Sequence, residues 1–174
     1  MNDDCAAVEA KDIKWMEYAQ TLATKAEAQG EIPVGAVIVK DGQVLGEGWN
    51  QSISNHDACG HAEIMAIRDA GQRVENYRLV GATLYVTLEP CPMCTGALVH
   101  SRIARLVYGA KDYKTGAVES VMNLLSHESM NHKVEFTSGV CEQACSAQLS
   151  QFFKTRRAEK KAAKLAAKLL SGGD

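Results

Sequence analysis

Helical spacing of apolar side chains, together with residues that start and stop helices, predicts five helices along the chain. Asp12 is suited to an N-cap, Gly30 to a stop and Pro92 to a first turn. From Glu142 onward a Lys/Ala-rich stretch has strong helix propensity. The expected helices cover residues 13–29, 61–70, 92–100, 118–125 and 142 to the end of the chain.

Short apolar runs predict strands between these helices. The Asp41-Gly42 pair is a strong hairpin signal, and the near-continuous apolar run over 82–88 is typical of a strand buried on both faces. The order of elements predicts an α/β protein: a three-layer α/β/α sandwich in which helices cover both faces of a mixed central sheet. The expected strands cover residues 34–39, 43–49, 82–88, 106–108 and 133–137.

Composition narrows the class of protein. The 174 residues are 46% hydrophobic and 23% charged, which excludes a disordered, collagen-like or coiled-coil chain. No apolar run approaches the roughly 18 residues of a membrane span, and the acidic start Met1-Asn2-Asp3-Asp4 does not fit a secretory signal. We therefore expect a cytoplasmic protein without a membrane partner, with one domain over 12–153 and a basic helical tail over 154–174. Six cysteines in such a chain favour thiols or metal ligands over disulfides.

The net charge of −2 conceals an uneven distribution. Residues 1–151 carry 12 basic and 19 acidic side chains, a balance of −7, whereas residues 152–174 carry 7 and 2, a balance of +5. An acidic body with a basic tail indicates a polyanionic partner, although a charge run is also typical of a solvated helix face.

Two short segments carry the residue types of a metal centre, and each opens an expected helix. They are His61-Ala62-Glu63 and Cys91-Pro92-Met93-Cys94. Cys91 and Cys94 are three residues apart, so both sulfurs face one side of a helix start, where backbone N–H groups favour thiolates. With the imidazole of His61 they make the N/S set of a zinc whose fourth position is left to water.

Glu63 can reach such a water without being a ligand. Zinc lowers the pKa of bound water from roughly 15.7 to about 7, and a glutamate beside it can take the proton and return it. Attack of the resulting hydroxide on an amidine-type ring carbon, with loss of ammonia, is a hydrolytic deamination.

Two other interpretations of the cysteines stay open at this point. Cys91 and Cys94 could be a redox pair of the thioredoxin type, which would leave the histidine segment unexplained. A structural zinc site needs a fourth ligand, for which Cys59 is a candidate. Cys141 and Cys145 are expected to be buried thiols on one helix face.

The histidine and cysteine segments, with 27 residues between Glu63 and Cys91, resemble the zinc-dependent nucleoside and base deaminases. The resemblance to the tRNA-acting adenosine deaminases of bacteria covers nearly the whole chain. Two departures are the segment 57–60, where Pro-Thr-Ala is more usual, and Pro92, which guanine and cytosine deaminases also carry. The matching segments are 31–37, 46–50, 61–66, 76–79, 82–94, 100–103, 108–112, 114–117, 130–132, 152–153 and 156–157.

The resemblance implies a cytidine deaminase-like fold and a homodimer that binds a tRNA anticodon stem-loop. It implies that His61, Cys91 and Cys94 hold one Zn²⁺ per subunit, and that Glu63 moves protons during conversion of adenosine to inosine at the wobble position. It further implies ten substrate-binding residues: Asn50, Pro33, Val34, Asp112, Asn131, His132, Phe152, Phe153, Arg156 and Arg157.

Several of these roles have plainer alternatives. Asn50 would bind the flipped nucleotide or simply cap a turn, and Val34 would line the purine pocket beside Pro33 or pack in the core. Asp112 would lie near the ribose or form an ordinary turn. Asn131 and His132 would approach the anticodon loop.

In the tail, one ring of Phe152-Phe153 could enter the core while the other stacks on an unpaired base, and Arg156 and Arg157 suit phosphates or base edges. Beyond Lys160 the sequence matches no motif of the family, and a solvated amphipathic helix or an auxiliary phosphate contact are both open. Two rival functions remain: a free-base or nucleoside deaminase, and a non-catalytic RNA-binding module with a structural zinc, which would not need Glu63.

Overall fold

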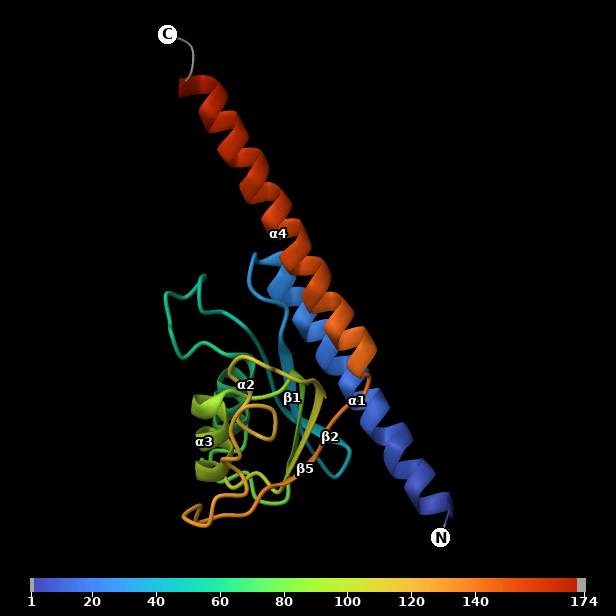
Figure 1. Ribbon diagram of the computed structural model, residues 1–174. Helices are drawn as coiled ribbons and strands as arrows, with labels where there is room; N and C mark the ends of the chain where they lie inside the picture. Colours follow the sequence, from blue (N-terminus) through green and yellow to red (C-terminus); the bar gives the residue numbers. More distant parts are fainter. Residues whose placement is uncertain (1, 172–174) are drawn as a thin grey trace.

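A five-stranded sheet with the order β2-β1-β3-β4-β5 lies between two pairs of helices (Figure 1). The computed structural model describes the backbone of residues 2–171 and the side chains of residues 9–169, so residues 172–174 of the expected tail lie outside it. The elements are α1 (Asn2–Ala28), β1 (Gly35–Lys40), β2 (Gln43–Trp49), α2 (Ala62–Arg73), β3 (Thr83–Leu88), α3 (Pro92–His100), β4 (Arg105–Ala110), β5 (Glu135–Thr137) and α4 (Glu142–Ser171).

The sheet is mixed, as expected. β1 pairs antiparallel with both β2 and β3, whereas β4 runs parallel to β3 and β5. The β1–β2 hairpin turns at Asp41 and Gly42, which both have positive φ angles (51° and 76°) and so confirm the predicted turn. In the described part of the chain, no helix is long and apolar enough to cross a membrane.

Alternate side chains of the central strands enter two separate cores, which confirms the three-layer α/β/α sandwich. On β1, Ala36 and Ile38 pack in the core under α2 and α3, whereas Val37 and Val39 pack against α1 and the start of α4. Figure 1 shows the two pairs of helices on opposite faces of the sheet. A strand that is buried on both faces has the near-continuous apolar sequence seen here.

Two glycines of β2 allow α2 to lie unusually close to the sheet. A Cβ atom on Gly48 would lie 2.1 Å from the carbonyl oxygen of Ala62, and one on Gly46 would lie 2.4 Å from the backbone nitrogen of Ala70. Any side chain at either position would push α2 outward. The first turn of α2, next to His61, is therefore held directly against the sheet.

The predicted N-cap at Asp12 is wrong. α1 begins at Asn2, and Asp12 lies inside the helix with 3% of its surface exposed. Its carboxylate accepts two hydrogen bonds from Arg105, at 2.9 and 2.6 Å, and one from the Tyr85 hydroxyl at 3.0 Å. These contacts join α1 to β3 and β4, and they explain why a residue typical of helix ends is tolerated in a helix interior.

The helix predicted over 118–125 is also wrong, because this segment forms turns. Its apolar side chains Val118 and Leu125 do enter the core. The backbone N–H groups of residues 118–120, which a helix would leave unpaired in its first turn, instead donate to the Glu89 carboxylate. The buried carboxylate of Glu89, which is distant in the sequence, thus determines the backbone conformation of this segment.

We predict that Asp12→Ala lowers the free energy of unfolding by about 3 kcal/mol, because it leaves the Arg105 guanidinium without its partner. Equilibrium unfolding in urea measures this effect. Glu27→Ala, at an exposed position of the same helix, is the matched control and should change stability by less than about 0.5 kcal/mol. Equal loss in both variants would contradict the role given to Asp12.

Candidate functional site

The starts of α2 and α3 bring the three predicted ligands together. His61 is the N-cap residue of α2, and Cys91 is the N-cap residue of α3. Both residues have an extended backbone, and neither side chain makes a capping hydrogen bond. Cys94 lies in the first turn of α3. Each sulfur is 3.6 Å from Nδ1 of His61, and the three ligand atoms all lie within 4.8 Å of one another.

This geometry fits a tetrahedral zinc. Zn–S and Zn–N distances of about 2.3 and 2.0 Å place pairs of ligand atoms roughly 3.5–3.8 Å apart, close to the distances seen here. Two thiolates and an imidazole are also the donor types that zinc prefers. Cys59 is exposed and does not belong to the cluster, so the structure gives no support to the four-ligand structural site.

The two thiols of the cluster differ sharply in acidity. A hydrogen bond from the Cys94 thiol, with further help from His61, lowers the pKa of Cys91 to about 4 although burial opposes the shift. The same hydrogen bond and burial raise the pKa of Cys94. The pair therefore shares one proton, and a metal that binds both sulfurs must displace it.

Glu63 has the environment of a proton carrier. Only 4% of its surface is exposed, and burial raises the pKa of its carboxyl to about 7. At that pKa both protonation states are accessible near neutral pH, which is what a general acid–base group requires.

A cavity of about 180 Å³ opens onto these groups. It is smaller than the roughly 300–1,000 Å³ of pockets for drug-sized ligands, and it suits one base-sized group. The lining residues come from the ends of β2 and β3, the starts of α2 and α3, and two loops: Ile32, Val34, Asn50, His61, Glu63, Leu88, Glu89, Cys91, Asp112 and Thr115.

Of the residues expected to contact the base, Asn50 and Val34 line the cavity and Pro33 does not. Pro33 is buried beside it, and the 39% exposed Ile32 forms the wall in its place. Asn50 lines the cavity and also caps α2, because its Oδ1 accepts a hydrogen bond from the backbone of Ala62 at 3.0 Å. Binding of a nucleotide by its Nδ2 stays a prediction.

Asp112 also lies in the cavity wall, and it is at the same time a turn former. Oδ1 accepts backbone hydrogen bonds from Lys114 and Thr115 at 2.9 and 3.2 Å, and Oδ2 accepts one from the Thr115 hydroxyl at 2.7 Å. These bonds fix the orientation of the carboxylate at the cavity mouth.

Glu89 is a residue of this site that the sequence did not predict. It is 2% exposed, and Oε1 accepts three backbone hydrogen bonds at 2.9–3.1 Å while Oε2 accepts one at 3.1 Å and one from a hydroxyl. Burial alone would raise the pKa of Glu89, but these hydrogen bonds outweigh it and hold the pKa below its usual value. The donors are the backbones of Asp112, Val118, Glu119 and Ser120 and the Ser120 hydroxyl.

The loop that Glu89 holds carries the cavity residues Asp112 and Thr115. The approach is so close that a Cβ atom on Gly116 would lie 2.6 Å from the Glu89 carboxylate carbon. The one signal for Glu89 in the sequence was an acidic residue directly after a strand with a near-continuous apolar run.

Asn131 and His132 are not brought to the cavity. Arg102 donates to the backbone and side-chain oxygens of Asn131 at 3.3 and 3.0 Å, and His132 Nε2 lies 2.7 Å from the carbonyl oxygen of Ile103. Residues 102 and 103 follow the last turn of α3, whereas Cys91 and Cys94 lie at its first turn. A contact of these two residues with RNA stays a prediction.

The tail residues lie on α4, which packs beside α1 and then extends beyond it (Figure 1). Phe152 is 7% exposed and Phe153 is 42% exposed, with ring centroids 5.5 Å apart in an edge-to-face arrangement. Phe153 is therefore the ring with a face available for stacking. Arg156 and Arg157 are both exposed, and Arg156 pairs with Glu159 at 3.3 Å.

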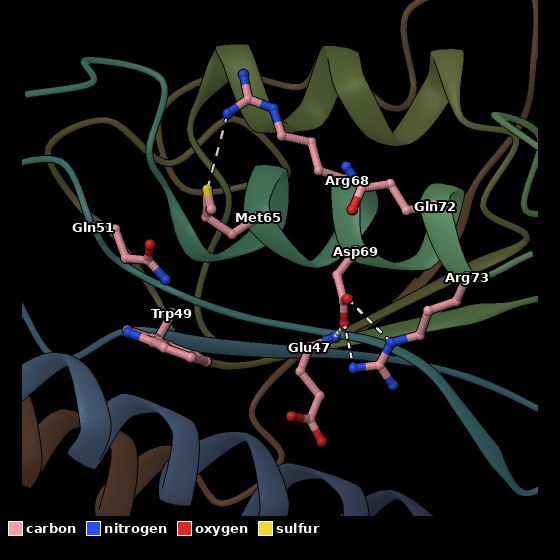
Figure 2. A pocket seen from close by; sticks show the side chains of 8 residues that line it. All are labelled: Glu47, Trp49, Gln51, Met65, Arg68, Asp69, Gln72 and Arg73. Carbon is pink, nitrogen blue, oxygen red and sulfur yellow. Dashed lines mark hydrogen bonds and ion pairs between the residues drawn. The ribbon is translucent and has the colours of Figure 1, made fainter. Parts of the chain in front are cut away.

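A second cavity, of about 400 Å³, lies at the outer edge of the sheet between β2 and α2 (Figure 2). Its charged side chains all have partners: Asp69 pairs with Arg73 at 2.8 Å, Arg68 pairs with Asp57 at 3.2 Å, and Glu47 accepts a hydrogen bond from the Tyr18 hydroxyl. None of the three clustered metal-ligand candidates lines it. The smaller cavity is therefore the candidate active site.

Comparison with known proteins agrees with this geometry. Residues 9–110 match the zinc-binding region of cytidine and deoxycytidylate deaminases. The chain is 55% identical over 170 residues to the tRNA-specific adenosine deaminase of Haemophilus influenzae, covering 97% of this chain and 98% of that protein. It is 46% identical over 154 residues to that of Bacillus subtilis, covering 88% and 96%.

A solved structure of a tRNA:A34 deaminase, which edits A to I at the wobble position of transfer RNA, superimposes with a TM-score of 0.75. The two sequences are 42% identical, and the match covers 78% of this chain and 98% of the other. The cytidine deaminase-like fold and a zinc-dependent deaminase chemistry are thereby confirmed.

We predict that Cys91→Ala and Cys94→Ala each retain less than about a tenth of the wild-type zinc, because two remaining ligands cannot hold the ion. Elemental analysis of the purified proteins measures this. Cys59→Ser, which removes an exposed thiol outside the cluster, should keep the full zinc content. Undiminished zinc in both alanine variants would contradict the assignment of the ligands.

We predict that Glu89→Gln lowers kcat/KM by about 10- to 100-fold while zinc content stays unchanged, because the amide cannot accept all the hydrogen bonds that hold the loop. Faster proteolysis within residues 111–120 should accompany the loss. Glu27→Gln, which alters an exposed carboxylate on α1 outside the cavity lining, is the control and should keep the wild-type kcat/KM. A wild-type rate in Glu89→Gln would refute the role of Glu89.

Proposed function

The chain belongs to the cytidine and deoxycytidylate deaminase family, among its tRNA-specific adenosine deaminases, and we propose that it hydrolyses adenosine to inosine at the wobble position of a tRNA anticodon. The observation that carries this proposal is the meeting of three zinc-type ligands and a buried glutamate at one base-sized cavity. The relatives that are 46–55% identical to this chain over most of its length are named tRNA-specific adenosine deaminases, whereas a guanine deaminase of known structure is 32% identical, which supports RNA over a free base as the substrate.

His61, Cys91 and Cys94 are the residues that would hold zinc, one ion per subunit. Zinc, when bound there, supplies a Lewis acid that makes hydroxide available near neutral pH. Each subunit has one cluster of this kind among its described residues, which supports the stoichiometry.

Glu63 carries the protons of the reaction. It takes a proton from the attacking water and delivers it to N1 of the purine ring. Glu63 then takes the remaining proton from the C6 hydroxyl and passes it to the amino group, so that the C6–N bond breaks, ammonia departs and C6–O becomes the carbonyl of inosine. A carboxyl with a pKa of about 7 can both accept and release a proton without a large energy cost.

The other cavity residues position the base. Asn50, held by its bond to the start of α2, would hydrogen-bond the flipped nucleotide, while Val34 lies against the ring. Asp112, at the cavity mouth, would lie near the ribose. Pro33 would act only indirectly, by setting the course of the chain into Val34.

The RNA-facing residues outside the cavity fit a homodimer on an anticodon stem-loop. Asn131 and His132 lie at the far end of α3 from their own cavity, so we assign their RNA contacts to a dimer in which they would face the anticodon loop from the other subunit. Phe153 would stack on an unpaired base, with Phe152 packed behind it, and Arg156 and Arg157 would contact phosphates or base edges.

The deaminase domain over 12–153 would carry the chemistry, and the tail over 154–174 would serve the RNA. Exposure supports this division, because every described residue from Phe153 to Leu169 is exposed whereas Phe152 is buried. We place the protein in the cytoplasm, where its tRNA substrate would be found.

The test is to incubate the protein with total tRNA and to sequence the product for inosine at the wobble base. We predict that Glu63→Gln binds zinc and tRNA as the wild type does but releases ammonia about 10²–10⁴-fold more slowly, because the proton carrier is lost. Free adenine, guanine and cytosine derivatives, assayed in parallel, should not be deaminated at a comparable rate.

Three results would count against the proposal. Faster turnover of a free base than of tRNA would favour a small-molecule deaminase. Retained ammonia release in Glu63→Gln would refute the role of that residue. Tight tRNA binding with no inosine formed by the zinc-loaded wild type would favour a non-catalytic RNA-binding module.

A further inference from the structure

We propose that the exposed end of α4 binds phosphates of the tRNA backbone in the anticodon stem, outside the loop that enters the cavity. This inference rests on the proposed function, and it assigns a partner surface to the stretch beyond Lys160 that matches no family motif. The surface, called the basic stripe below, consists of Lys154, Arg157, Lys161, Lys164 and Lys168.

The basic stripe is a single face of the helix. Its members follow one another at intervals of three, four, three and four residues, the spacing that places side chains above one another on an α-helix. The 14 residue steps from Lys154 to Lys168 span about 21 Å at a rise of 1.5 Å per residue. A row of cations of that length matches an extended polyanion rather than a single phosphate.

The basic stripe continues the face on which Phe153 is exposed. Phe153 precedes Lys154 and lies four residues before Arg157, so its ring stands at the beginning of the row. Phe152, which points to the core, is 7% exposed against 42% for Phe153. A nucleic acid whose unpaired base stacks on Phe153 would therefore meet the basic stripe next.

Because of the direction in which α4 runs, the basic stripe extends past the end of the sheet at which the active-site cavity lies. α1 and α4 run side by side in the same direction, and Gln148 donates to the Thr24 hydroxyl at 3.2 Å (Figure 1). α1 ends at Ala28, and the loop after it supplies Ile32 and Val34 to the cavity. The helix beyond Phe153 thus projects from the cavity end of the molecule.

The chemistry of the basic stripe suits phosphates and not bases. Lysines act as flexible point charges that bind phosphate without reading sequence. Residues 1–151, with a balance of −7, offer no comparable excess of positive charge to an extended polyanion. The stem of the bound tRNA is the extended polyanion that begins where the loop ends, and it is the occupant to which we commit.

The experiment compares two triple variants of the full-length protein. Lys161→Gln/Lys164→Gln/Lys168→Gln removes three charges of the basic stripe, and glutamine keeps a similar helix propensity. The matched control, Lys11→Gln/Lys14→Gln/Lys40→Gln, removes three exposed charges elsewhere. Both are titrated with full-length tRNA at several salt concentrations, and with the same anticodon loop on a shortened stem.

For full-length tRNA we expect the variant of the basic stripe to bind about tenfold more weakly at low salt, with the slope of log K against log salt reduced by about two to three. The control should stay within about twofold of the wild type. On the shortened stem all three proteins should bind alike, and turnover at saturating RNA should be unchanged, since no cavity residue is altered.

Two results would overturn this inference alone while the wild type still forms inosine. One is equal behaviour of the two triple variants with full-length tRNA. The other is an equal loss of affinity on the shortened stem, which would assign the lysines to the loop. Absence of inosine from any tRNA with the wild type would overturn the proposed function, and this inference with it.

Discussion

Two helix starts meet at one edge of the sheet, and the rest of the site depends on that meeting. α2 can approach β2 closely only because Gly46 and Gly48 have no side chains, which holds His61 beside the start of α3. Both ligand-bearing N-caps leave their side chains free of capping bonds, so imidazole and thiolate can face a metal. The N-terminal dipoles and unpaired N–H groups of two helices then favour the negative charge that the sulfurs bring. The close contact between α2 and β2 thus determines both the packing of these elements and the position of the candidate metal ligand His61.

Four buried carboxylates show how surroundings decide what an acidic side chain does. Asp12 is neutralised by Arg105, and Glu31 and Glu89 each receive several hydrogen bonds from neighbouring loops. These three are structural, because donors hold them in place. Glu63 is buried to a similar degree, but burial dominates and raises its pKa to about 7. Among these carboxylates it is therefore the one whose surroundings suit proton transfer.

Structural features that depend on residues close together in the chain could be predicted from the sequence, whereas features that depend on distant residues could not. The cluster of His61, Cys91 and Cys94 could be predicted because each residue lies at a helix start that local residues specify. Gly30 and the Asp41-Gly42 turn were found for the same reason. Asp12 was misassigned because its partners lie 73 and 93 residues away. The false helix over 118–125 arose because Glu89, about 30 residues earlier, captures its backbone N–H groups. Burial of these carboxylates depends on tertiary packing, which helical and strand periodicity do not report.

The uneven distribution of charge along the chain can be interpreted only together with the path of α4. A balance of −7 spread over the body would slow the approach of any RNA, and a basic segment elsewhere would only compensate for it. Here the first part of the helix is anchored in the core through Cys145 and Phe152, while its later part is exposed. A rigid helix therefore carries the positive charge to a fixed place, beyond the edge of the sheet at which the cavity opens. In the proposed complex, an approaching polyanion would be attracted to the basic stripe, so electrostatics would orient the RNA before any base is read. Because the first part of α4 is anchored in the core, its basic side chains lie at a fixed position, and this matters more for orienting the RNA than the number of lysines.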